Sequence, residues 1–214
     1  MTGADALVLA KGVAIGLMVA APVGPVNLLC ARRALAHGWP SGMATGLGAT
    51  LADTILASLA AIGLAWATGF VAAHRTALVL AGALFLLALG WHTLRAPPPA
   101  PGASRDAAGL AADCASAFLL TIANPVTVVS FAGSYVALAI HVDAHVDAAD
   151  ALLVGGVFAG AACWWTLLVA AACRMRERFA GRGLALANRV AGVAIMGFGA
   201  AALAGLVLEA ARGG

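Results

Sequence analysis

One acidic residue stands inside an apolar stretch that is long enough to cross a membrane. Asp53 lies near the middle of Ser41–Trp66, in the run GLGATLADTILASLAAIGL. An ionised aspartate at the centre of a bilayer costs about 2.5–3.5 kcal/mol, and such residues usually face the interior of a helix bundle and mark ion or proton pathways. We therefore predict that Asp53 holds a substrate ammonium, exchanges a proton, or does both. The alternative is a structural acid that hydrogen-bonds a neighbouring helix or pairs with an interface arginine.

Two short motifs, GPVN and NPVT, place a proline inside apolar stretches. A proline lacks a backbone N–H, and its ring crowds the carbonyl four residues earlier. Pro25 is therefore expected to free the carbonyl of Ala21, and Pro125 that of Thr121. Freed carbonyls at membrane depth are tolerated only where protein or a water-filled cavity receives them. The alternative is an ordinary kink, because Gly and Pro are common in transmembrane helices, but a matched pair favours a functional break.

The half-helices that begin at these motifs offer N–H donors and the positive end of a helix dipole, which suit a carboxylate. Asparagine side chains beside the breaks add neutral donors and acceptors. The predicted substrate and proton site consists of Gly24, Pro25, Asn27, Asn124, Pro125 and Thr127 together with Asp53.

Two adjacent tryptophans, Trp164 and Trp165, lie in mid-span, although tryptophan favours the membrane interface. Neighbouring positions on a helix face different directions, so at most one of them lines a substrate path. We take Trp164 as the candidate.

The composition is that of an integral membrane protein. Hydrophobic residues make up 63% of the chain and charged residues only 10%, against about 45–50% and about 25% in soluble domains. A span needs roughly 20 apolar residues, and no alternating pattern indicates a β-barrel. Six stretches qualify as helical spans: Ala6–Cys30, Ser41–Trp66, Ala77–Leu94, Cys114–Ile140, Leu152–Cys173 and Leu184–Leu208. We expect lipid as a partner and no nucleic acid.

The chain divides into two similar halves. Residues 96–113 include the run APPPAPGASRDAAG, which favours an extended cytoplasmic linker between residues 1–95 and residues 114–214. Each half has three predicted helices and a break in the first of them. Because three is an odd number, the halves insert with opposite orientation. Inverted repeats with interrupted helices are typical of secondary transporters, whose substrates bind at the breaks near the midplane.

The basic residues predict the orientation. The first, third and fifth loops contain Arg32, Arg33, Arg95, Arg105, Arg174, Arg176, Arg178, Arg182 and Arg189, whereas the other side holds only Lys11, Arg75 and Arg212. The positive-inside rule makes the odd loops cytoplasmic and places both termini outside. We therefore expect a multi-pass protein of the cell (inner or plasma) membrane, and a second copy of the chain is a candidate partner in a homo-oligomer.

These features in their order resemble the lysine exporter (LysE/RhtB) family of amino-acid efflux proteins. The resemblance rests on Gly24-Pro25-x-Asn27 followed by ARRALAHG, on GLGATLAD ending at Asp53, on LAGALFLLALGWHTLR at Leu80–Arg95, on NPV at Asn124–Val126, and on RVAGVAIMGFGAAAL at Arg189–Leu203. It implies six helices and export of amino acids or similar small metabolites, driven by the proton gradient.

In that family the Gly-Pro of the first helix, the acid of the second and the Asn-Pro of the fourth are the characteristic polar features. Two departures concern the substrate. Val126 stands where many members carry a lysine, and Pro22-Val23 stands where Gly-Pro-Gly-Pro is usual in much of the family.

We expect alternating access between the two halves, with a zwitterion bound where the breaks meet Asp53, and neither enzymatic activity nor a cofactor. A divalent-metal or other solute exporter is one alternative, although such a metal path needs several acids, histidines or thiolates within the spans. A thiol–disulfide electron conduit is another, but Cys30 follows Pro25 by five residues whereas Cys114 precedes Pro125 by eleven. No metal-ligand spacing is present among the four cysteines.

Overall fold

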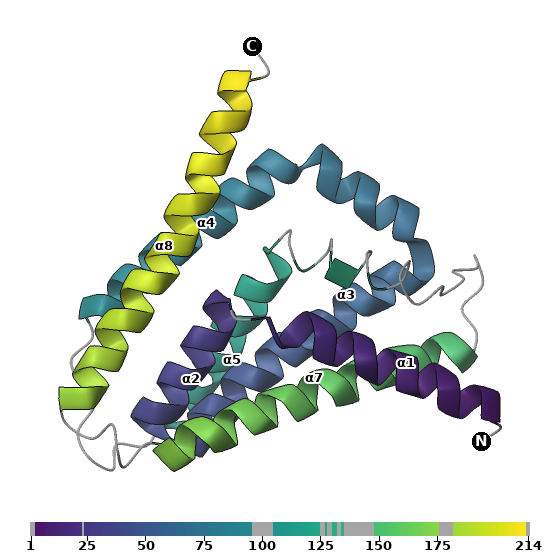
Figure 1. The fold of residues 1–214 in the computed structure, drawn as a ribbon, viewed down its shortest axis with the longest axis horizontal. Helices are drawn as coiled ribbons and strands as arrows, with labels where there is room; N and C mark the ends of the chain where they lie inside the picture. The colour runs from purple at the N-terminus through teal and green to yellow at the C-terminus, as the bar shows by residue number, and fades with distance from the viewer. Residues whose placement is uncertain are drawn as a thin grey trace.

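The computed structural model describes residues 3–22, 24–95, 105–124, 127, 130–131, 134, 148–175 and 182–212. Throughout these ranges the regular structure is helical (Figure 1). The helices are α1 (Gly3–Ala20), α2 (Pro25–His37), α3 (Trp39–Ala73), α4 (Arg75–Arg95), α5 (Ala107–Ile122), α7 (Ala148–Met175) and α8 (Arg182–Arg212).

Five helical segments are long and apolar enough to cross a membrane. They are Gly3–Ala20, Trp39–Ala60, Arg75–Arg95, Ala148–Met175 and Arg189–Glu209. An all-α membrane protein is thereby confirmed. Of the predicted span Cys114–Ile140, the part up to Ile122 belongs to the apolar helix α5, and most of the rest lies outside the described residues. Six spans in two inverted repeats therefore remain a prediction.

The first predicted span, Ala6–Cys30, consists of two helices rather than one. α1 ends at Ala20, Gly24 is extended (φ −141°, ψ −176°), and α2 begins at Pro25. Proline suits the first position of a helix because the N–H that it lacks has no partner there in any case. The proline of the GPVN motif thus begins a helix after the break instead of bending a continuous one.

The helix α5 begins inside the segment predicted as a linker. Asp106 caps its first turn, because the carboxylate accepts a hydrogen bond of 2.8 Å from the N–H of Gly109. Residues 107–113 are therefore helical, and the boundary between linker and helix lies seven residues earlier than the apolar pattern indicated.

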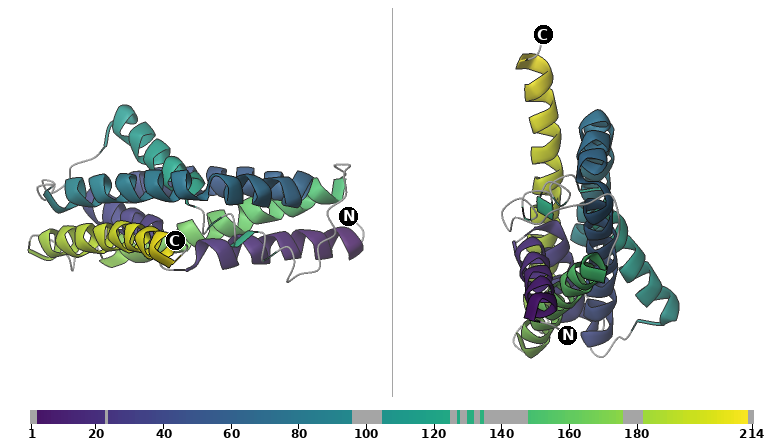
Figure 2. Two further views of the ribbon diagram at one scale, coloured as in Figure 1. Left: turned by 90° about the horizontal axis from the view of Figure 1, so that it is seen from above. Right: turned by 90° about the vertical axis from the view of Figure 1, so that its right-hand side faces the viewer.

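The helices associate in pairs. α1 packs against α7, α3 against α5, and α4 against α8. Figure 2 shows α3 and α4 in one layer and α1 and α8 in another, with α5 on the outer side of α3. Glycines let the backbones approach closely at all three contacts. A Cβ added to Gly12, Gly48 or Gly90 would collide with backbone atoms of the paired helix.

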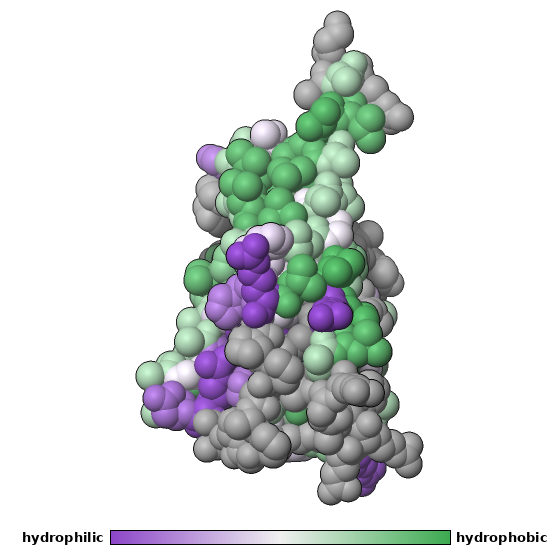
Figure 3. Space-filling model, turned by 90° about the vertical axis from the view of Figure 1, so that its left-hand side faces the viewer, coloured by the Kyte–Doolittle hydropathy of each residue, from purple (hydrophilic) through white to green (hydrophobic). Residues whose placement is uncertain are grey.

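The outer face of the α4–α8 pair is apolar. Figure 3 shows hydrophobic residues over the upper part of this side of the molecule, and most of the strongly hydrophilic residues lie from its middle downward. The large exposed apolar side chains include Leu80, Leu84, Trp91, Val190 and Val193. A surface of this composition is suited to contact with lipid.

Candidate functional site

The two predicted breaks line a single cavity of about 670 Å³. Gly24 and Pro25 come from the break between α1 and α2, whereas Asn124 and Thr127 follow the end of α5. These residues are about one hundred positions apart in the sequence. The structure therefore brings together four of the predicted site residues, and Pro125 lies outside the described residues.

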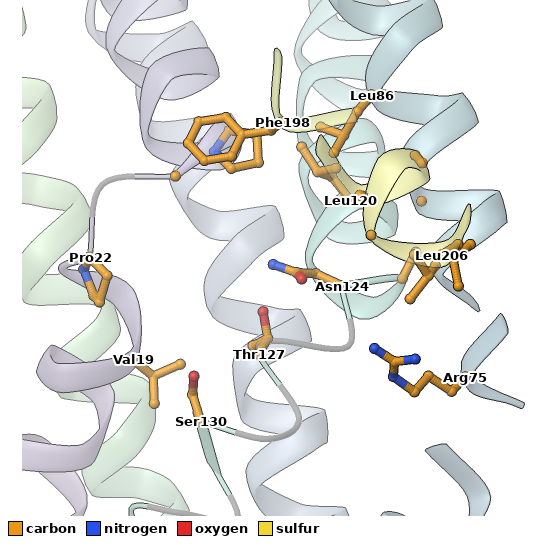
Figure 4. A pocket seen from close by; sticks show the side chains of 18 residues that line it. Val19, Pro22, Arg75, Leu86, Leu120, Asn124, Thr127, Ser130, Phe198 and Leu206 are labelled. Atoms are coloured by element: carbon orange, nitrogen blue, oxygen red, sulfur yellow. The ribbon is translucent and has the colours of Figure 1, made fainter. Parts of the chain in front are cut away.

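The cavity has one polar side and several apolar walls. Asn124, Thr127 and Ser130 project into it from one side (Figure 4). The walls from α4 and α8 include Val79, Leu86, Phe198 and Leu206, and Leu120 of α5 adds to them. A concave site with apolar walls and a few polar groups is the usual form of a small-molecule site.

Arg75 is the one charged residue among the described residues that line the cavity. It begins α4, and its guanidinium points toward the side that carries Asn124 and Thr127 (Figure 4). Its side chain is 50% exposed and forms a bidentate ion pair with Glu209 of α8, with 2.8 Å between Nη2 and Oε1. Arg75 therefore stands at the rim of the cavity.

Asn27 stabilises the first break from inside the protein. Its amide Nδ2 donates to the carbonyls of Ala20 (3.2 Å) and Pro22 (2.9 Å), and its Oδ1 accepts a hydrogen bond of 2.9 Å from Nε1 of Trp164. Asn27 is 9% exposed and is not among the lining residues. Asn27 and Trp164 thus meet each other across α2 and α7, and in this structure neither contacts the cavity.

The second break satisfies a carbonyl that the sequence predicted to be free. The carbonyl of Thr121 accepts a hydrogen bond of 3.2 Å from the N–H of Asn124, because the chain turns at the end of α5. The carbonyl of Asn124 in turn accepts from the N–H of Thr127 at 3.1 Å. The protein itself thus receives the carbonyl that Pro125 was expected to free.

Asp53 is buried, but the structure does not bring it to the cavity. It is 3% exposed and is not a lining residue. The neighbouring hydroxyls of Thr50 and Thr54 donate to carbonyls of their own helix, at 2.9 Å and 2.7 Å. Among the described residues, none makes a hydrogen bond or an ion pair with the Asp53 carboxylate.

A second buried acid, which the sequence analysis missed, lies beside Ser41 at the start of α3, whereas Arg75 follows the end of that helix. Asp113 of α5 is 1% exposed and Arg33 of α2 is 7% exposed, with 3.1 Å between Oδ1 and Nε. Ser41 of α3 donates to the other Asp113 oxygen at 2.5 Å, and Arg105 lies 3.6 Å from Oδ1.

The other two guanidinium nitrogens of Arg33 also have partners. Nη1 donates to Oγ1 of Thr45 (3.2 Å) and to the carbonyl of Asp113 (2.9 Å), and Nη2 donates to Oγ of Ser116 (2.8 Å). We call these six residues, Arg33, Ser41, Thr45, Arg105, Asp113 and Ser116, the Arg33 cluster. It joins α2 and α3 to α5 and so ties residues of the two predicted halves together.

Two further basic groups of α2 lie close to the Arg33 cluster. Burial lowers the pKa of Arg32 to about 10, and repulsion from Arg33 acts in the same direction, so Arg32 stays charged at neutral pH. Burial also lowers the pKa of His37, helped by Arg105 and opposed by Asp113, so its imidazole is neutral there. This end of the molecule is therefore basic at neutral pH.

One sequence signal for Asp113 was available. Asp106 precedes an apolar run that contains Asp113 seven residues later. This pattern is typical of a helix that begins after Asp106 and includes Asp113. The Pro-rich run before it led instead to a linker prediction.

The comparisons with known proteins give one match. A family model described as LysE type translocator matches residues 17–205. This range contains both breaks, Asp53, and the residues of the Arg33 cluster. No curated protein and no solved structure matches the chain.

Proposed function

Because the chain belongs to the LysE type translocator family, we propose that it is a secondary transporter that exports amino acids or related small zwitterionic metabolites. The family match and the five helices that are long and apolar enough to cross a membrane support a multi-pass membrane transporter. The proposal adds the substrate class, the proton coupling and alternating access between the two halves.

The shared cavity is the observation that carries this proposal. Secondary transporters bind their substrates where interrupted helices meet, and here Pro25 and Asn124 line the same space. A volume of about 670 Å³ lies within the range of small-molecule sites, roughly 300–1,000 Å³. The N-terminus of α2 offers the positive end of its dipole to a carboxylate, and the C-terminus of α5 offers a negative end to an ammonium.

The pairing of the helices supports an inverted repeat. Let α5 correspond to α1, α7 to α3, and α8 to α4. A two-fold axis that relates the halves would then make the α1–α7 and α3–α5 contacts equivalent, and the α4–α8 contact would lie on the axis. Each of these contacts is observed, as a two-fold relation between the halves requires.

The two ends of the molecule differ in the way that alternating access requires. The cavity reaches the surface at Arg75, which follows the end of α3, whereas the buried Arg33 cluster lies at the start of α3, where Ser41 contacts Asp113. We propose that this is the outward-open state and that the basic Arg33 end is cytoplasmic, as the positive-inside rule favours. In the inward-open state the Arg33 cluster would separate.

We propose Asp53 as the proton site rather than as a substrate ligand. Its carboxylate is buried, has no partner among the described residues, and lies off the cavity. An isolated buried carboxylate is costly in its charged form, so its protonation is sensitive to any change in the packing around it. A conformational change that exposes Asp53 to one side and then to the other would couple proton entry to substrate exit.

The alternatives gain no support from the described helices. Within them, no group of three His, Cys, Asp or Glu residues is placed to hold a metal ion. The buried thiol of Cys30 donates to the carbonyl of Gly42 at 3.5 Å and belongs to the packing between α2 and α3.

Efflux from loaded cells tests the proposal. Cells are fed dipeptides, and amino-acid efflux is compared with the protein absent, present, and carrying Asp53→Asn. Asp106→Asn is the matched control, because asparagine caps a helix as well as aspartate does. We expect at least one amino acid whose efflux requires the protein, is lost in Asp53→Asn, and persists in Asp106→Asn at equal membrane abundance. Absence of protein-dependent efflux for every amino acid would refute the exporter, and efflux that survives Asp53→Asn would refute the role of Asp53.

A further inference from the structure

The charges around the cavity discriminate between classes of amino acid. Two features of the cavity favour an anion: Arg75 at the rim and the N-terminus of α2 at Pro25. No acidic side chain is among the described lining residues. The C-terminal ends of α1 and α5, beside Pro22 and Asn124, suit the single ammonium of an amino acid.

We propose that this cavity selects amino acids with uncharged, apolar side chains, that it rejects lysine and arginine, and that Arg75 binds the substrate carboxylate at the rim. The inference rests on the proposed function, because it names the substrate class of the same site.

The walls fit an apolar side chain. Val79 and Leu86 of α4 and Phe198 and Leu206 of α8 line the cavity, and Leu120 adds to the same lining. Transfer of an aliphatic or aromatic side chain from water to these walls is favourable, because its apolar surface is removed from water. A lysine or arginine side chain would lose its hydration among these residues without gaining a carboxylate partner, which is strongly unfavourable.

Arg75 is available to a carboxylate because its present partner is held weakly. Both side chains of the Arg75–Glu209 pair are about half exposed, at 50% and 53%, and exposed ion pairs contribute little net stability. The planar guanidinium matches a substrate carboxylate with the same two-point geometry that it uses toward Glu209. An incoming carboxylate therefore replaces Glu209 at little cost.

A panel of dipeptides tests the selectivity. Cells expressing the full chain are loaded with leucine, methionine, phenylalanine, lysine, arginine or glutamate, and protein-dependent efflux is measured for each. We expect efflux of the apolar amino acids to exceed that of lysine by about tenfold or more, because an unpaired buried charge is costly. Lysine or glutamate efflux that equals leucine efflux would overturn the selectivity. Absence of efflux for the entire panel would refute the proposed function instead.

Two single variants separate substrate binding by Arg75 from a structural role of the ion pair. Arg75→Gln should lower leucine efflux at subsaturating loading by about tenfold, the usual scale for one charge-assisted contact. Glu209→Gln breaks the same pair but leaves the guanidinium in place, so leucine efflux should stay within about twofold of the unmodified protein. Equal losses in both variants would overturn the assignment of Arg75.

Arg95→Gln is the matched control for loss of an arginine from α4. Arg95 lies at the other end of that helix, over the ring of Trp91 at 3.9 Å, and does not line the cavity. We expect leucine efflux in this variant to be unchanged at equal membrane abundance. A loss that matches that of Arg75→Gln would also overturn the assignment.

Discussion

Removing the charge of Asp113 should destabilise the protein and loosen the end of the bundle that the Arg33 cluster closes. Asp113 is 1% exposed and pairs with an arginine that is itself 7% exposed. In Asp113→Asn, the guanidinium of Arg33 would remain buried without its carboxylate. Breaking a buried pair by removing one partner costs about 3–5 kcal/mol, so we expect a loss of this size in the free energy of unfolding.

A double-mutant cycle gives the magnitude of the interaction. Arg33→Met and Asp113→Leu should each be strongly destabilising. In the double variant neither charge of this pair remains. The main polar loss is then that the fully buried hydroxyl of Ser41 no longer has an acceptor. An unsatisfied buried hydroxyl costs about 1–3 kcal/mol. The coupling between the two sites should therefore be at least about 3 kcal/mol.

The assay is reversible unfolding of the purified protein in bicelles by sodium dodecyl sulfate, followed by tryptophan fluorescence. The matched control is Glu209→Gln, which removes one partner of the exposed pair with Arg75 and should change stability little, because exposed ion pairs contribute little net stability. If Asp113→Asn costs no more than that control, or if the two losses in the cycle simply add, the reasoning about the Arg33 cluster is refuted.

Cys30 reports on the opening of this end. Its thiol is fully buried between α2 and α3 and lies three residues before Arg33. In a chain that keeps Cys30 as its single cysteine, we expect slow alkylation by N-ethylmaleimide and faster alkylation once Asp113→Asn is introduced. Unchanged alkylation in a variant that is destabilised as expected would mean that the Arg33 cluster contributes stability without controlling access.

Two further pairs of neighbouring residues give sharp comparisons. Gly156→Ala should prevent close packing of α7 on α1, because its Cβ would collide with the α1 backbone, whereas Gly155→Ala has open space around it; thermal stability in detergent should fall only in the first. Trp164→Phe removes the hydrogen bond to Asn27, whereas Nε1 of Trp165 is buried without a partner among the described residues. Trp164→Phe should therefore cost about 1 kcal/mol more than Trp165→Phe in the same unfolding assay, and the reverse order would contradict the packing described for α7.

Local chemistry determined much of the fold from the sequence. The excess of apolar residues predicted a helical membrane protein, because a bilayer leaves backbone groups no other partner. Because proline lacks a backbone N–H in any environment, Pro25 alone was enough to predict that the helix is interrupted there. The family resemblance rested on motifs of this kind and was confirmed by the match over residues 17–205.

The tertiary structure decided which polar groups meet. Asp53 and Asp113 are both acids within apolar stretches, but only packing of α5 against α2 and α3 gives Asp113 an arginine, and no described residue pairs with Asp53. Likewise, both breaks were visible in the sequence, whereas their common cavity depends on helices that are distant along the chain. Hydropathy and proline act through neighbouring residues. Ion pairs and cavities depend on long-range packing, which no local pattern contains.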